Sequence, residues 1–138
     1  MLEEGYNVYK EEQKVKLSQL LNNLETELEQ NPELIDGIVE GSDTKLEQLA
    51  KELAHASWLG IDQADEYRLA EVIETIFKHS QDVELLSDLC RRSLDIIAKN
   101  FRSDRANELF DLMKHKVPNS GFLIKKVQEQ HHLIELSY

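Results

Sequence analysis

The sequence has few of the residues that crosslink or interrupt a chain: one cysteine, two prolines and five glycines among 138 residues. A single cysteine, Cys90, cannot form an internal disulfide, which is typical of cytoplasmic proteins. Few glycines and prolines with many charged residues favour a helical fold over disorder. Long apolar runs are missing too, and Met1–Gly5 lacks the basic start of a signal peptide. We therefore expect a cytoplasmic protein without a membrane span.

Basic residues are also scarce, with 16 Lys and Arg against 27 Asp and Glu, which gives a formal net charge of −11. The imbalance is greatest in residues 1–50, which hold 12 acidic and 4 basic residues, whereas residues 101–138 hold 5 and 6. Proteins that bind nucleic acid directly usually carry a basic stripe, and anionic membranes repel an acidic surface. The charge therefore argues against both roles and favours a protein partner with a basic surface.

Apolar residues recur with the period of an α-helix. Between Val83 and Phe101 they occupy one half of a helix, and the charged residues crowd the other half. A face this wide must be covered by several neighbours, so we predict a central core helix here, with Cys90 as one of its buried residues. In the first segment, the leucines form a lengthwise seam, while Val8 and Val15 point to another face.

Capping residues and helix breakers divide the chain into seven predicted helices, two of them short. The first runs from about Asn7 to Gln30, the second follows Asn31-Pro32-Glu33 and stops at Gly41, and the third opens at Ser42–Thr44 and ends at Gly60. The others run from Asp62 to about His79, from a cap at Ser80 or Asp82 to Asn100, from a cap at Ser103 or Asp104 to before Pro118, and from about Phe122 onward. We expect this last helix to bury Leu123, Ile124, Val127 and Ile134.

No strand pattern interrupts these segments, and their connections are short. Short connections make consecutive helices antiparallel neighbours. We predict an all-α fold: a compact single-domain bundle of about six to seven antiparallel helices over residues 1–138, in which residues 1–7 can fray. The alternative is a short HEAT-like α-α stack, but the helix starts are irregularly spaced and no repeated residue pattern is found.

Two Glu-x-x-His motifs are the strongest chemical lead. Glu52 with His55, and Glu129 with His132, have the spacing that provides iron ligands in ferritin-like bundles. On a helical wheel both motifs project away from the apolar faces of their helices, whereas a buried metal site needs inward ligands. We expect solvated faces, no cofactor and no metal, and keep a metal-binding bundle as an alternative function.

Other reactive residues also have structural interpretations. His131 lies within the apolar stripe of the last helix, where a histidine is usually satisfied by one hydrogen bond. Cys90 shares the face of apolar residues, so it lacks the exposed setting of a nucleophile. The glycines form no phosphate-binding loop. We therefore predict that the protein is not an enzyme.

Surplus apolar and acidic residues point to binding instead. If the third helix reaches Gly60, Trp58 lies nearly opposite its core stripe, where it is either an interface anchor or covered by another helix such as the first. The last helix also has apolar residues away from Val127, namely Phe122, Leu133 and Leu136. Either this helix is sandwiched within the fold, or these residues form a second apolar strip for a homodimer. We predict a non-catalytic protein–protein interaction module, such as an adaptor, inhibitor or immunity-type binder; the alternatives are an acidic nucleic-acid mimic and the metal-binding bundle. The predicted partner-binding residues are Trp58, Leu59, His55, Glu25, Glu29, Glu33, Leu133 and Leu136.

Overall fold

The computed structural model describes residues 2–30 and 45–133, and this part of the chain folds into α-helices without strands. The predicted all-α class is confirmed. The described helices are α1 (Leu2–Gln30), α2 (Lys45–His55), α3 (Gln63–His79), α4 (Val83–Asn100), α5 (Ser103–Lys116) and α6 (Gly121–Gln130). None of them combines the length and the hydropathy that a membrane-spanning segment requires.

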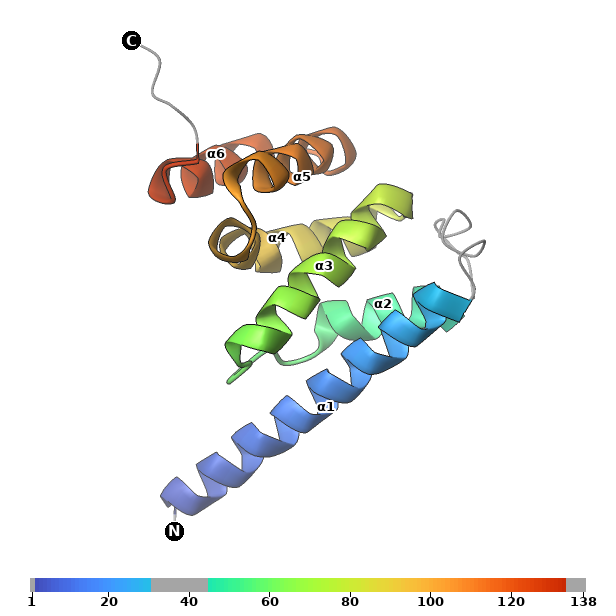
Figure 1. Ribbon diagram of the computed structural model, residues 1–138, viewed down its shortest axis with the longest axis vertical. Helices are drawn as coiled ribbons and strands as arrows, with labels where there is room; N and C mark the ends of the chain where they lie inside the picture. Colours follow the sequence, from blue (N-terminus) through green and yellow to red (C-terminus); the bar gives the residue numbers. More distant parts are fainter. Residues whose placement is uncertain (1, 31–44, 134–138) are drawn as a thin grey trace.

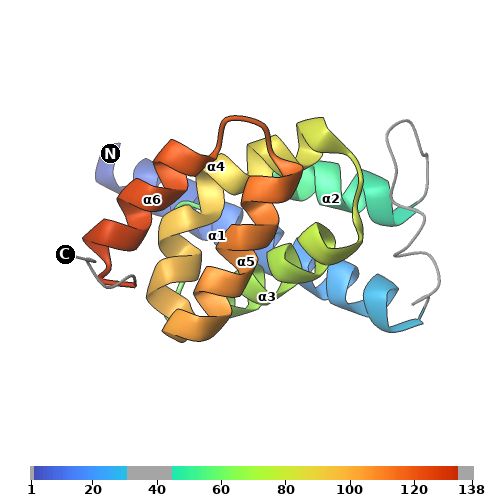
Figure 2. The same ribbon diagram turned by 90° about the horizontal axis from the view of Figure 1, so that it is seen from above.

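The helices are arranged as three stacked pairs (Figure 1). The pair α1–α2 lies at one end of the molecule, α3–α4 in the middle and α5–α6 at the other end. Between layers, α1 contacts α3 and α2 contacts α4, and in the same way α3 contacts α5 and α4 contacts α6. Seen from above, the α5–α6 layer covers the middle pair (Figure 2). The predicted compact helical bundle is confirmed, and its helices lie in three layers.

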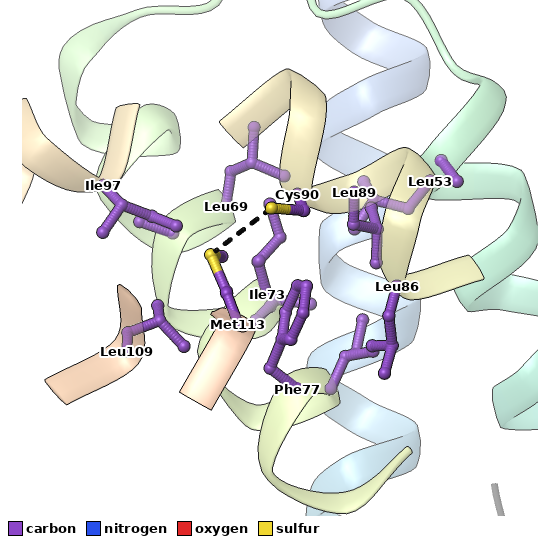
Figure 3. Packing of buried hydrophobic residues seen from close by; sticks show 14 of the residues in the cluster. Leu53, Leu69, Ile73, Phe77, Leu86, Leu89, Cys90, Ile97, Leu109 and Met113 are labelled. Carbon is purple, nitrogen blue, oxygen red and sulfur yellow. Dashed lines mark hydrogen bonds between the residues drawn. The ribbon is translucent and has the colours of Figure 1, made fainter. Parts of the chain in front are cut away.

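The core is built around α4, as its apolar face predicts. This helix contacts α2, α3, α5 and α6, and eight of its residues are buried. Figure 3 shows the side chains of α3, α4 and α5 that meet between the layers, including Phe77 and Leu86. The Cys90 thiol lies among them, with Sγ 3.8 Å from Sδ of Met113. Burial raises the pKa of Cys90 to about 11, so the thiol stays protonated at neutral pH, in agreement with a core role.

Two of the predicted helix caps are confirmed. The Asp62 side chain accepts a hydrogen bond from the Asp65 amide at 3.0 Å, and Asp82 accepts one from the Leu85 amide at 3.2 Å. Each carboxylate accepts a hydrogen bond from an amide that has no partner within the helix. Its negative charge is also stabilised by the positive N-terminal end of the helix dipole. The cap predicted for α5 is wrong, because the N-cap is Arg102, which makes no side-chain cap bond.

Other helix boundaries differ from the prediction. Helix α1 begins at Leu2 rather than near Asn7, and α2 ends at His55 rather than at Gly60. The short helix after Asn31 and the cap at Ser42–Thr44 fall on residues 31–44, outside the described residues.

The predicted burial of α6 is correct only in part. Ile124 and Val127 are buried, but Leu123 is 44% exposed. Helix α6 packs on α4 and α5 along the face of Ile124, Val127 and Gln128, and Leu123 lies at the edge of that face. Ile134 lies outside the described residues.

Candidate interaction surface

Trp58 belongs to the connection after α2, not to a helix face. It is half-buried and packs against the core; its indole N–H donates to the Leu53 carbonyl oxygen at 3.2 Å. The guanidinium of Arg92, from α4, lies over the indole ring, 3.8 Å from the ring centre. The helical-wheel position assigned to Trp58 is therefore wrong, because α2 ends three residues before it.

Arg92 holds the end of α2 against α4. Its guanidinium donates to the Ala54 carbonyl at 2.6 Å and to the Ala56 carbonyl at 2.7 Å. These are carbonyl groups at the C-terminal end of a helix, where a cation is favoured by the helix dipole. Burial lowers the pKa of Arg92, but a guanidinium remains charged at neutral pH. We call these bonds, with the indole stacking, the Arg92 contact.

A polar cleft of about 330 Å³ lies between α2 and the start of α4, lined in part by Lys51, His55 and Asp88. Asp82 also lines this cleft, and the fully buried Glu47 lies beside it. Burial and the neighbouring Asp82 carboxyl raise the pKa of Glu47 to about 7. Burial acts to raise the pKa of Asp82 too, but hydrogen bonds from Glu47 and the α4 amides outweigh it and lower that pKa. The last proton of the pair therefore lies on Glu47 and is released only near neutral pH.

The remaining predicted binding residues are scattered. Leu59, His55 and Glu29 are exposed, and Leu133 is partly buried against the core. Glu25 is exposed and paired with Arg68 of α3. Glu33 and Leu136 lie outside the described residues.

The Glu-x-x-His residues point outward, as the helical wheels predict. Glu52, His55, Glu129 and His132 are all exposed, and His132 follows the end of α6 with a positive φ. Within residues 2–30 and 45–133, no group of three or more His, Cys, Asp or Glu side chains is placed to hold a metal ion. His131 is a boundary residue whose Nε2 lies 3.1 Å from Oδ1 of Asp95.

The N-terminal half of α1 presents an uncovered apolar face. The buried leucines of α1 start only at Leu17, whereas Val8 and Val15 are 58% and 54% exposed. The two valines lie on the side of the helix opposite Leu17, since about 100° separates successive residues. Glu11 and Glu12 lie between them, and these four residues line one shallow hollow together with the exposed Lys16. We call Val8, Glu11, Glu12 and Val15 the α1 strip.

Helix α6 carries a second exposed apolar site. Phe122 is 77% exposed, the largest exposure among the large apolar side chains described. It lies on the side of α6 opposite the buried Ile124 and Val127. Lys125 and Lys126 follow it by three and four residues and are also exposed.

The sequence pattern separated the two valines from the leucine seam of α1 but did not identify them as a site. Whether the side of α1 away from the leucines is covered depends on how the other helices pack, which the local sequence does not show. In Figure 1 the N-terminal turns of α1 project beyond the rest of the stack.

Comparisons with protein-family models, curated proteins and solved structures find no significant match to this chain.

Proposed function

We propose that the protein is a non-catalytic protein–protein interaction module of the cytoplasm that binds a basic amphipathic helix on the α1 strip. The single observation that carries this proposal is the pair of exposed valines on the face opposite the core, with two glutamates between them. Exposed apolar residues that lie together and are rimmed by charge are typical of binding surfaces.

The spacing of the strip defines the partner. Val8 and Val15 are seven residues apart, which is two helical turns and about 10 Å along the axis. A helix that lies along the strip would place two apolar residues against the valines and a lysine or arginine beside Glu11 and Glu12. Burial of the valines would supply affinity, and the carboxylates would set the register and speed the encounter.

Pairing of α1 with another α1 is disfavoured by the same residues. The strip has valines at equivalent heptad positions and glutamates between them. Two such strips, parallel or antiparallel, would bring glutamates of both helices into one seam, and like charges in a seam are destabilising. A basic partner helix removes this repulsion.

Several carboxylates of α3 pair with basic side chains of neighbouring helices. Arg105 donates to both oxygens of Glu74, and Lys99 lies 3.3 Å from Glu66. A nucleic-acid mimic needs a continuous array of carboxylates, so this pairing supports the interaction module over the mimic.

The test uses a synthetic helix as a probe. A peptide with two leucines seven residues apart and lysines at the positions between them should bind, whereas the same peptide with glutamates in place of the lysines should not. Val8→Ser with Val15→Ser should weaken peptide binding at least tenfold, measured by fluorescence anisotropy. Both sites are exposed, so stability should change by less than about 0.5 kcal/mol per site.

The matched control is Val83→Ser, which removes a similarly exposed valine outside the strip. It should leave the peptide affinity unchanged. Equal binding by wild type and the valine double variant would contradict the proposal.

A further inference from the structure

We propose that α6 of a second copy of this chain is a basic helix that docks on the α1 strip, so that the protein associates head to tail. This inference rests on the proposed function, because it names the partner of the same strip.

Over one turn the two helices carry the same pattern with opposite charge. In α1, Val8 is followed at three and four residues by Glu11 and Glu12. In α6, Phe122 is followed at three and four residues by Lys125 and Lys126. On a helix, these offsets put one charged residue on each side of the apolar residue, one turn further along. At the seventh residue they differ, because α1 has Val15 and α6 has the exposed Glu129.

Both patterns face away from the core of their own molecule. Val8 lies opposite the buried leucines of α1, and Phe122 lies opposite the buried Ile124 of α6. A contact between two copies can therefore bring valine against phenylalanine while each pair of glutamates meets a pair of lysines. This arrangement buries apolar surface and neutralises the charges beside it.

The two sites lie at opposite ends of the stack, with α1 in the first layer and α6 in the last (Figure 1). They cannot meet within one molecule. A contact between different patches on two copies is heterologous, and each new molecule leaves one strip and one α6 unoccupied. Association should therefore continue beyond a dimer as the concentration rises.

The contact should be weak. Helix α6 has only 10 residues, about 15 Å of helix, so the buried area falls below that of a standard stable interface. The net charge of −11 on each copy adds long-range repulsion, which salt at physiological strength screens beyond about 8 Å. The close glutamate–lysine contacts are screened less at that strength.

The test is a charge exchange between the two sites, read by sedimentation at rising protein concentration. The first variant carries Glu11→Lys and Glu12→Lys, and the second carries Lys125→Glu and Lys126→Glu. All four positions are exposed on helices, so circular dichroism should show wild-type folding. In physiological salt the wild type should show a mass that rises with concentration, and each variant alone should remain monomeric.

An equal mixture of the two variants should recover the association. In the mixture, the lysines on the strip of the first variant meet the glutamates on α6 of the second variant. The unchanged α6 of the first variant likewise matches the unchanged strip of the second variant. Each Glu→Lys change adds two charges and each Lys→Glu change removes two, so the variants have net charges of −7 and −15. Repulsion follows the product of the two net charges, which is larger for the mixed pair than for two copies of the first variant, so recovery relative to that variant cannot come from reduced overall repulsion.

A wild type that remains monomeric at millimolar concentration would overturn the inference, as would association that neither variant changes. The proposed function is tested separately, with the lysine-rich peptide and the first variant. If that peptide binds wild type but not the first variant while the wild type stays monomeric, the strip binds basic helices and only α6 is the wrong partner. If the peptide fails to bind, the proposed function fails.

Discussion

Glu47 is an ionisable group placed where a charge is costly. It lies in the first turn of α2, fully buried, beside the carboxyl that caps α4. Lys51, one turn further along α2, lies 3.8 Å from its Oε1 and acts to lower its pKa, but burial and Asp82 outweigh that effect. The carboxyl is thus half-ionised near pH 7, where the isolated side chain is fully charged.

Stability should therefore fall as the pH rises through neutrality. The pKa of Glu47 is raised in the folded state from 4.5 to about 7, so the folded state keeps the proton where the unfolded state has lost it. This contribution favours folding below pH 4.5 and is lost as the pH approaches and passes 7. Glu47→Gln, which keeps a neutral side chain, should raise the free energy of unfolding at pH 8 by roughly 1 to 3 kcal/mol and flatten its pH dependence between 6 and 8.

Urea unfolding at several pH values measures this effect. Glu52→Gln removes an exposed carboxylate from the same helix and should leave the pH profile unchanged. A wild-type profile that is flat from pH 6 to 8 would show that Glu47 is already ionised.

At the scale of elements, α2 is joined to α4 by the Arg92 contact. One side chain closes the end of one helix from another helix more than 30 residues further along the chain. Without it, partly buried carbonyl groups at the end of α2 would lose their donors, and the indole ring would lose its cover.

Arg92→Met keeps the length and the apolar stem of the side chain but removes its donors. We expect it to lower the free energy of unfolding by about 2 to 4 kcal/mol, since buried acceptors lose charged partners. The neighbouring Arg91 is exposed and pairs with Asp88 of its own helix, so Arg91→Met should cost less than about 1 kcal/mol. Equal losses in the two variants would mean that the Arg92 contact adds no stability.

Fluorescence of Trp58, the one tryptophan in the chain, should change only in the Arg92 variant.

This contact also explains which part of the site could be predicted from sequence. Apolar periodicity located α3 and α4, and the caps at Asp62 and Asp82 are local signals within a few residues of the amides they bind. The end of α2 depends on a side chain distant in sequence, which no local pattern reveals. The sequence pattern therefore predicts a helix through Trp58, whereas α2 ends at His55. In the same way, the exposure of Val8 depends on packing between helices.

The whole molecule is a stack whose middle pair is covered from both sides. In such layered folds stability is the sum of each layer's own contribution and its contacts with its neighbours, so the outer layers open more easily. Many of the fully buried side chains lie in α3 and α4, such as Ile73, Phe77 and Leu89.

Amide hydrogen exchange should follow this order. We expect the strongest protection in α3 and α4, weaker protection in α6, and the fastest helical exchange in the first turns of α1, before Leu17. Dilute protein should be used, so that contacts between copies do not add protection. Equal protection of α6 and α4 would mean that the molecule opens only as a single unit.

Formal charge changes steadily along the three layers. The α1–α2 helices hold nine acidic and five basic residues, α3–α4 hold seven and five, and α5–α6 hold four and five. The molecule must therefore possess a sizeable electric dipole moment parallel to its long axis. An external field, or the field of a strongly cationic surface, would turn it so that the α1 end approaches first.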